Sequence, residues 1–311
     1  MSSNINCSEI RQEVYLSGYS VVTVLGLIFN CIALYFLFHL PHSAITIYMK
    51  NLAFADLLLI FTLPLRIYGY TLPAEAASST RERWLCQVTG AFLLLNMYGS
   101  IFLLACIAFD RCLAVCYPLR SRRLRQHAGW VCVGVWLFNI CACLVSFLPS
   151  LSNENQNNNS CLHGQPPFVT KLGPTIGAVI SGFLVPAGII TFSSVALLRA
   201  MGHSQVVKDG IINKVKVVRM LTANISIFLL CFLPYHIILL LYQWSNKTCS
   251  LNEAYHATLL IACFNTVLDP FLYYFTSETM KNAVREVKVG KNKFFELPDL
   301  SFEKHKHSVS I

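Results

Sequence analysis

Charged residues are scarce in this chain. Asp, Glu, Lys and Arg make up 13% of its 311 residues, whereas hydrophobic residues make up 55%. A soluble globular domain carries about 25% charged residues, roughly twice the fraction found here. The chain therefore lacks the polar residues needed to cover a water-exposed core. This excludes an ordinary soluble protein and points to the lipid bilayer as its solvent.

Catalytic signatures are missing as well. The sequence contains no His-Glu-x-x-His, Gly-x-Ser-x-Gly or P-loop pattern, and Asp56, Asp110 and Asp269 lie in separate motifs. The paired, interrupted helices of a transporter repeat are not found either. We therefore expect no catalytic residues and no structural metal, and an enzyme, a transporter and a channel are the less favoured alternatives.

Long apolar runs recur seven times along the chain. A helix needs about 20 residues to cross a bilayer, and each run is long enough. Proline occurs inside four of them, which transmembrane helices tolerate where neighbours bind the freed backbone groups. The predicted spans are Tyr15–His39, Ile47–Thr71, Cys86–Tyr117, Ala128–Pro149, Leu172–Ala200, Val215–Trp244 and Asn252–Thr276. The sequence thus predicts an all-α membrane protein with a seven-helix domain over residues 15–276.

Basic residues in the connecting segments predict the orientation of these helices. The loop after the third span, the loop before the sixth and the tail carry 16 Lys and Arg, against five on the opposite side. Positive loops stay in the cytoplasm, so residues 277–311 are expected inside and residues 1–14 outside, in a multi-pass plasma-membrane protein. Residues 1–14 show no apolar signal-peptide core, and the first span is expected to direct its own insertion. Because the net charge of +9 lies in these short loops, it argues against a nucleic-acid partner.

Sequons and cysteines agree with that orientation. Asn6, Asn158 and Asn246 lie in Asn-x-Ser/Thr sequons on the predicted outer side. Four of the thirteen cysteines lie there too, namely Cys7, Cys86, Cys161 and Cys249. An even number in an oxidising compartment predicts two disulfides, with three possible pairings from the sequence alone. The other nine are expected to be packing residues.

Polar and aromatic residues form an ordered series of motifs inside the spans. Ionisable groups are costly there and mark functional positions. The motifs are Gly26-Leu-Ile-Phe-Asn30, Leu52-Ala-Phe-Ala-Asp56, Asp110-Arg111-Cys112, Trp136, Pro186, Phe228-Leu-Leu-Cys231-Phe232-Leu-Pro234 and Asp269-Pro270-Phe271-Leu272-Tyr273. Together they resemble the rhodopsin-like (class A) G-protein-coupled receptors over nearly the whole chain. Cys112 departs from the usual Asp-Arg-Tyr triplet but leaves its two charged members intact.

The resemblance implies roles for these positions. Arg111 would pair with Asp110 at rest and receive a heterotrimeric G protein once the sixth span swings outward about Pro234. The activation and coupling residues would be Asp110, Arg111, Phe228, Phe232, Pro234, Pro270 and Tyr273. A polar core able to hold an allosteric Na⁺ would comprise Asp56, Asn96, Ser100, Asn265 and Asp269. No other cofactor is expected.

The resemblance also bears on the outer and inner ends. The disulfides would be Cys86–Cys161 and, as in nucleotide-type receptors, Cys7–Cys249. Residues 277–311 would begin with a short amphipathic helix 8 on the inner leaflet. Ser301, Ser308 and Ser310 in the tail would be kinase sites for arrestin.

Two ligand classes of the family, amines and retinal, are disfavoured because the residues that bind them are replaced here. Leu93 stands where amine receptors keep an acid, and Cys263 stands where opsins keep a lysine. Arg66 lies ten residues after Asp56, about 15 Å nearer the outside, and a guanidinium suits phosphate or carboxylate. Alternatively, Arg66 snorkels outward or pairs with Glu75.

Further motifs narrow the branch of the family. Leu63-Pro64-Leu65-Arg66 and Asn96-Met97-Tyr98-Gly99-Ser100 look like the nucleotide/lysophospholipid branch, and within it most like the fifth subtype of the lysophosphatidic acid receptors. Leu239 replaces the Lys or Arg that nucleotide receptors add above the histidine of span six, so one phosphate with a fatty chain fits better than a triphosphate. A nucleotide, a peptide and an orphan receptor remain alternatives. The predicted ligand-binding residues are Arg66, Tyr70, Leu93, Met97, Lys171, Tyr235 and His236, although a core hydrogen bond explains His236 equally well.

Overall fold

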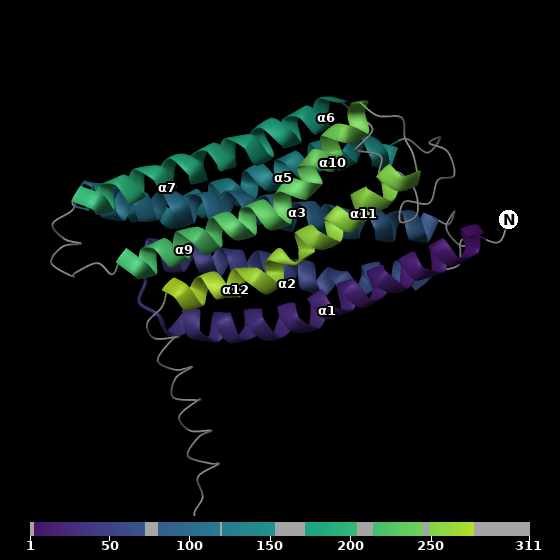
Figure 1. Ribbon diagram of the computed structural model, residues 1–311, viewed down its shortest axis with the longest axis horizontal. Helices are drawn as coiled ribbons and strands as arrows, with labels where there is room; N and C mark the ends of the chain where they lie inside the picture. Colours follow the sequence, from purple (N-terminus) through teal and green to yellow (C-terminus); the bar gives the residue numbers. More distant parts are fainter. Residues whose placement is uncertain are drawn as a thin grey trace, which may run out of the picture.

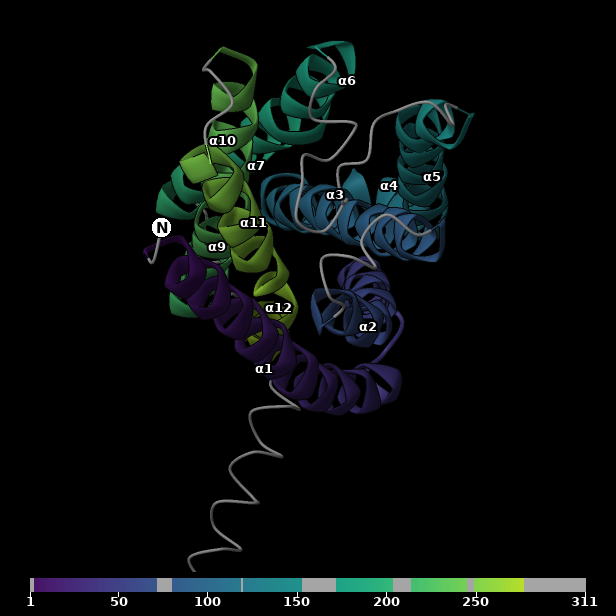
Figure 2. The ribbon, with the colours of Figure 1, turned by 90° about the vertical axis from the view of Figure 1, so that its right-hand side faces the viewer.

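The computed structural model describes residues 3–71, 80–118, 120–152, 172–203, 214–244 and 249–276. Long helices run side by side along the long axis of the molecule (Figure 1), and α3 packs against α2, α5 and α7 in the middle of the bundle (Figure 2). The elements are α1 Ser3–His39, α2 Ala44–Thr71, α3 Thr80–Cys116, α4 Ser121–Arg125, α5 Ala128–Ser152, α6 Leu172–Gly177, η2 Ala178–Leu184, α7 Val185–His203, α9 Lys214–Ile227, η3 Phe228–Phe232, α10 Leu233–Trp244, α11 Cys249–Cys263 and α12 Asn265–Thr276.

All seven predicted spans lie on helices. Six helical stretches of the described chain are long and apolar enough to cross a membrane, and α11 with α12 covers the seventh span in two pieces. The apolar stretches of α1 and α3 begin at Gln12 and Gln87, close to the predicted Tyr15 and Cys86, whereas the helices begin earlier, at Ser3 and Thr80. The apolar runs mark how much of a helix lies in lipid, whereas the helices themselves continue into polar sequence. Helix 8 and the tail lie outside the described residues.

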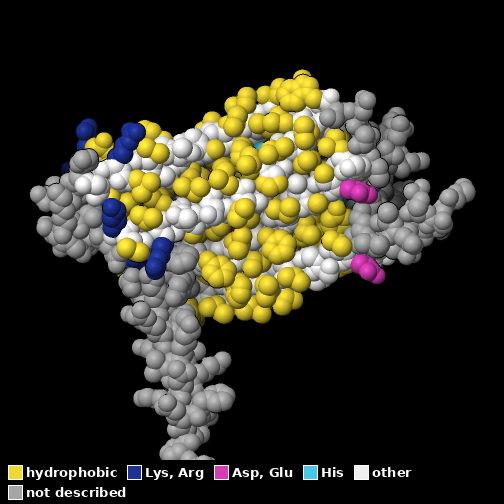
Figure 3. Space-filling view, viewed as in Figure 1, with side chains coloured by type: hydrophobic (Ala, Val, Ile, Leu, Met, Phe, Trp, Pro, Cys, Tyr) yellow, Lys and Arg dark blue, Asp and Glu magenta, His cyan; other side chains and the backbone are white. Residues whose placement is uncertain are grey.

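The surface has the pattern of a protein surrounded by lipid. Hydrophobic side chains cover the middle of the visible face, Lys and Arg gather at the end where α7 stops and α9 starts, and Asp and Glu lie toward the opposite end (Figure 3). Large apolar side chains point outward along the helices, among them Trp130 at 76% exposure and Phe192 at 70%. Such a wide apolar band would be exceptional on a soluble monomer.

The two π-helical segments each end shortly before a proline. η2 ends at Leu184, two residues before Pro186, and η3 ends at Phe232, two residues before Pro234. Proline removes a backbone donor and crowds the carbonyl four residues earlier, and a π-helical turn widens the helix at that point. The sixth span was expected to swing about Pro234, and the structure places the wide turn of η3 shortly before this residue.

Asn30 explains how the proline of the seventh span is tolerated. Pro270 has no N–H to donate to the carbonyl of Thr266, four residues earlier. Asn30 from α1 donates instead, with its Nδ2 at 2.7 Å from the Thr266 oxygen, and it also bonds the Gly26 carbonyl of its own helix at 3.0 Å. The helix is broken just before this point, where the Phe264 N–H bonds the Ile261 carbonyl at 3.1 Å.

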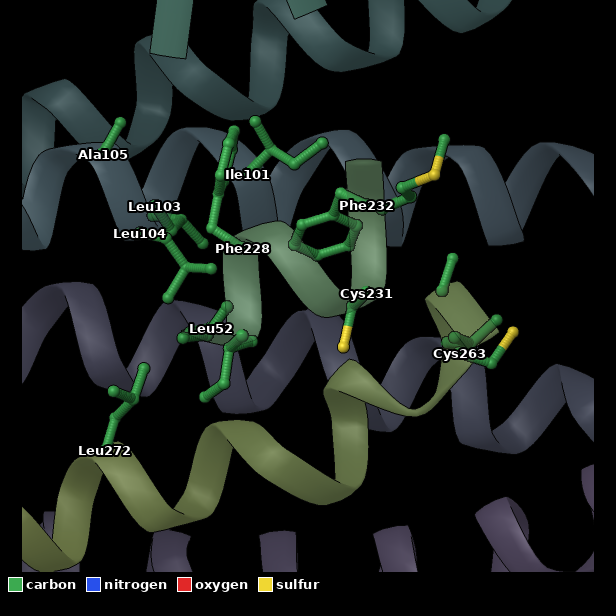
Figure 4. Packing of buried hydrophobic residues seen from close by; sticks show 14 of the residues in the cluster. Leu52, Ile101, Leu103, Leu104, Ala105, Phe228, Cys231, Phe232, Cys263 and Leu272 are labelled. Carbon is green, nitrogen blue, oxygen red and sulfur yellow. The ribbon is translucent and has the colours of Figure 1, made fainter. Parts of the chain in front are cut away.

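The core is one apolar cluster that runs through the bundle. Figure 4 shows η3 lying between α3 and α12, with Phe228 and Phe232 on the side of Ile101 and with Cys231 toward α12. Phe228 and Phe232 are 2% and 0% exposed, and their rings meet edge to face with centroids 6.1 Å apart. Phe228 and Phe232, both predicted to act in activation, therefore lie in the packed centre, where η3 packs against α3 and α11.

Candidate functional site

Arg66 is a buried cation near the C-terminal end of α2. Its residue is 5% exposed, and its guanidinium carbon lies 5.4 Å and 5.9 Å from the ring centroids of Tyr19 and Tyr70. Within the described residues it forms no ion pair, and its Nε has no hydrogen-bond partner. The burial contradicts the snorkelling alternative, whereas Glu75 lies outside the described residues. Ring faces offset part of the cost of burying a charge, and an anion would offset more of it.

A chain of ring contacts leads from Arg66 across the bundle. Tyr70 bonds His256 through its hydroxyl at 3.4 Å, and the Tyr255 ring lies 5.5 Å from the His256 ring. Tyr235 lies 5.9 Å from Tyr255. We call the connected set the aromatic belt; it consists of Tyr15, Tyr19, Tyr70, Tyr98, Tyr235, His236, Tyr255 and His256. The belt joins the Arg66 side, on α1 and α2, to α3 and α10.

An apolar cavity of about 550 Å³ begins at the far end of the belt. It lies between α3, α5, α6 and η2, and its walls include Tyr98, Asn139 and Gly182. Val145, which is 71% exposed, also lines it, so the cavity reaches the lipid-facing surface. Asn139 is 2% exposed and its Nδ2 has no partner among the described residues. The cavity is therefore a mainly apolar compartment whose wall includes a buried amide nitrogen, Asn139 Nδ2, that has no partner among the described residues.

The predicted ligand residues divide between the two ends of the belt. Tyr70 lies beside Arg66, whereas Tyr235 and His236 lie near Tyr98, with centroids 5.1 Å apart and with His236 5.8 Å from Tyr98. Leu93 and Met97 are each 1% exposed on α3. His236 is thus not a direct neighbour of Arg66, and its Nδ1 bonds the Phe232 carbonyl at 2.8 Å. Lys171 lies outside the described residues, as do Cys161, Asn158, Asn246 and the side chains of Cys7, Cys86, Cys249 and Asn6.

The predicted polar core is buried and only partly hydrogen-bonded. Asn96 donates to Asp56 at 3.2 Å, and Asn265 donates to Asp269 at 3.3 Å. Several buried oxygens have no hydrogen-bond partner among the described residues, namely Asp56 Oδ2, Asp269 Oδ1, Ser100 Oγ and Asn265 Oδ1. Hard cations prefer oxygen ligands, so this donor set fits Na⁺. The described chain contains no cluster of three His, Cys, Asp or Glu suited to another metal.

Near the C-terminal end of α3, Asp110 has two cationic partners. Arg111 Nη2 lies 3.0 Å from Asp110 Oδ2, and Arg125 Nε lies 2.7 Å from Asp110 Oδ1. The resemblance predicted the first pair but not the second. Tyr273 is fully buried, and its hydroxyl has no partner among the described residues. The role of these residues in coupling stays a prediction.

Sequence reasoning missed several residues around Arg66 and the cavity. Tyr15 and Tyr19 are four residues apart, so they lie on one face of α1 and reach Tyr70 together, at 5.7 Å and 5.9 Å. Tyr98 was quoted only within a motif, although it forms a wall of the cavity. The sequence did contain a signal, because Tyr and His are frequent in the helical turns that form the aromatic belt. A hydrophobicity pattern does not distinguish such residues from ordinary core residues.

Comparison with known proteins decides the family. Residues 29–273 match the family described as "7 transmembrane receptor (rhodopsin family)". The chain belongs to this family. It is a multi-pass membrane receptor of the G-protein-coupled class and not an enzyme.

Relatives place the receptor in the lysophosphatidic acid receptor branch. Lysophosphatidic acid receptor 6 of Gallus gallus is 36% identical over 309 residues, covering 92% of this chain and 98% of that protein. Lysophosphatidic acid receptor 4 of Homo sapiens is 33% identical, covering 85% and 75%. Lysophosphatidic acid receptor 5 of Mus musculus is 32% identical, covering 94% and 82%. The branch is as predicted, although overall identity to the sixth subtype is higher than identity to the fifth, which the motifs favoured.

Proposed function

We propose that this receptor is activated by an anionic lysophospholipid such as lysophosphatidic acid and signals through heterotrimeric G proteins from the plasma membrane. The observation that carries the proposal is Arg66, a buried guanidinium with no carboxylate partner in the described chain. Arginine recognises phosphate through paired hydrogen bonds. In this account the phosphate binds Arg66, with Tyr19 and Tyr70 beside it.

The fatty chain is assigned to the apolar part of the outer half. A ligand anchored at Arg66 meets the aromatic belt and, at its far end, the 550 Å³ cavity. Burying a chain of methylenes contributes about 0.8 kcal/mol for each group. A nucleoside di- or triphosphate would carry about one or two more negative charges than a single phosphate monoester, and Leu239 stands where a second cation would help to bind them; that position is 2% exposed and apolar. The names of the relatives support the same ligand class.

We also propose a Na⁺ site in the polar core and a membrane orientation for the receptor. Na⁺ at Asp56 and Asp269 would favour the resting arrangement, and arrestin would bind the cytoplasmic side after activation. The basic end of the bundle, where α7 ends and α9 begins, is assigned to the cytoplasm (Figure 3). The N-terminus is then extracellular.

The test is a ligand panel on receptor-null cells that express this chain. G-protein recruitment is measured for lysophosphatidic acid, for the monoacylglycerol with the same chain and for a set of nucleotides. We expect a response to lysophosphatidic acid alone. A response to nucleotides alone would favour the nucleotide receptor, and silence toward the whole panel, with normal surface expression, would favour a peptide ligand.

A further inference from the structure

Tyr98 contacts two elements, η2 and α10. On one side its ring lies against the backbone of η2, where a Cβ added to Gly182 would lie 2.5 Å from Tyr98 Cε1 and 2.8 Å from Cδ1. The same ring also meets His236 of α10 edge to face, with centroids 5.8 Å apart. Only glycine at position 182 leaves room for the ring in this place.

His236 is tied to the hinge of the sixth span. Its ring stacks on Phe183 with centroids 4.4 Å apart, and it is 2% exposed. Its Nδ1 bonds the carbonyl of Phe232, the last residue of η3 and two residues before Pro234. A displacement of His236 therefore acts on the backbone beside the proline.

Tyr98 and Gly182 also line the apolar cavity between α3, α5, α6 and η2. A group that fills the cavity beside Gly182 would lie against Tyr98, as an added Cβ at Gly182 would. Because packed cores resist compression, the ring moves away from η2 and toward α10 when this space fills.

We propose that Tyr98 transmits the filling of this cavity to the sixth span, by pressing on His236 and through it on the hinge at Pro234. The inference rests on the proposed function only for the identity of the filling group, an apolar chain. The transmission itself is a property of Tyr98, Gly182 and His236. A side-chain atom added at Gly182 should therefore raise the activity of the receptor in the absence of ligand.

The experiment needs no ligand. Basal guanine-nucleotide exchange is measured in membranes that carry the wild-type receptor, Gly182→Ala or Gly177→Ala at equal surface density. Gly177 lines the same cavity, but a Cβ there would meet nothing within 4 Å, so it controls for the change of residue type. We expect about a fivefold rise in basal exchange for Gly182→Ala, the lower end of coupling between sites, and no change for Gly177→Ala.

A second substitution shows whether the effect passes through Tyr98. In the Tyr98→Leu background, Gly182→Ala is expected to have no further effect, because the ring it pushes is gone. Tyr98→Trp enlarges the ring against an unchanged glycine and should raise basal exchange as well, which keeps the proposal testable if Gly182→Ala does not reach the surface. The proposal would be overturned if Gly182→Ala and Tyr98→Trp reached the surface but kept the basal exchange of the wild type. An equal rise in Gly177→Ala would overturn it too. Since no lipid is added, this failure is separate from a failure of the ligand panel.

Discussion

Arg125 binds both carboxylate oxygens of Asp110, with Nε 2.7 Å from Oδ1 and Nη2 3.2 Å from Oδ2. Arg111 reaches only Oδ2, at 3.0 Å. Asp110 is thus shared between the arginine expected to meet the G protein and an arginine at the end of α4. The two cations compete for one buried carboxylate, which is 3% exposed.

This sharing predicts opposite effects for two substitutions. Arg125→Ala leaves the whole carboxylate to Arg111, so basal G-protein activation should fall, by about two- to fivefold for an ion pair worth up to about 1 kcal/mol. Asp110→Asn releases Arg111, so basal activation should rise. Arg122→Ala on the same short helix is the control, because its exposed side chain has no ion pair in the described structure. If Arg125→Ala raised basal activity, the competition would be refuted.

Asn30 and Pro270 should be energetically coupled. Asn30→Ala leaves the buried Thr266 carbonyl without its donor, which costs about 1–3 kcal/mol, and the thermal midpoint of the purified receptor should fall by several degrees. In a Pro270→Ala background the backbone supplies the missing N–H, and the same substitution should cost much less. Ser20→Ala is the control, since Ser20 is exposed on α1 and bonds only the Leu16 carbonyl. Equal losses in both backgrounds would show that Asn30 has another role.

Sodium should bias the receptor toward rest through the polar core. Replacing Na⁺ by N-methylglucamine at constant ionic strength is expected to raise basal exchange in the wild type. Asp56→Asn removes the charged oxygen of Asp56 that lacks a partner, and its basal exchange should no longer respond to the replacement. A variant that keeps the full sodium response would place the ion elsewhere.

A bulky side chain in the cavity should weaken the response to long-chain lysophosphatidic acid more than the response to short-chain lysophosphatidic acid. Ala178 lines it, so Ala178→Phe should reduce the potency of lysophosphatidic acid with an 18-carbon chain by about tenfold or more, as expected when two methylenes lose their site. Lysophosphatidic acid with an eight-carbon chain should lose much less. Ile180→Phe on the same segment is the control, because Ile180 is 53% exposed and does not line the cavity. The same loss for both chain lengths would remove the cavity from the ligand path.

The helices were predictable from the sequence because lipid imposes long apolar runs, whatever packs inside them. The break at Phe264 was not, because no glycine or proline lies directly beside it and the interruption is a matter of backbone hydrogen bonding. The wide turns before Pro186 and Pro234 likewise depend on how a helix accommodates proline. The pattern of apolar residues along the sequence indicates neither the break nor the wide turns.

The candidate site was predictable where a residue type is costly in lipid. Arg66, Asp56 and Asp110 stand out in an apolar span, and the structure finds each of them buried. Tyr98 and Arg125 did not stand out, because a tyrosine is ordinary in a core and an arginine is ordinary in a loop. Their importance comes from partners distant in sequence, namely Gly182 for Tyr98 and Asp110 for Arg125.

The most direct test of the account is lysophosphatidate binding to purified receptor in neutral-lipid nanodiscs, for the wild type, Arg66→Gln and Arg66→Lys. Removing one partner of a buried charge pair costs about 2 kcal/mol or more, so Arg66→Gln should bind at least about 30-fold more weakly. Arg66→Lys should lie between the two, because it keeps the charge but loses the paired hydrogen bonds. The monoacylglycerol with the same chain should bind all three weakly and alike. Unchanged lysophosphatidate binding in a correctly folded Arg66→Gln receptor would contradict the phosphate assignment.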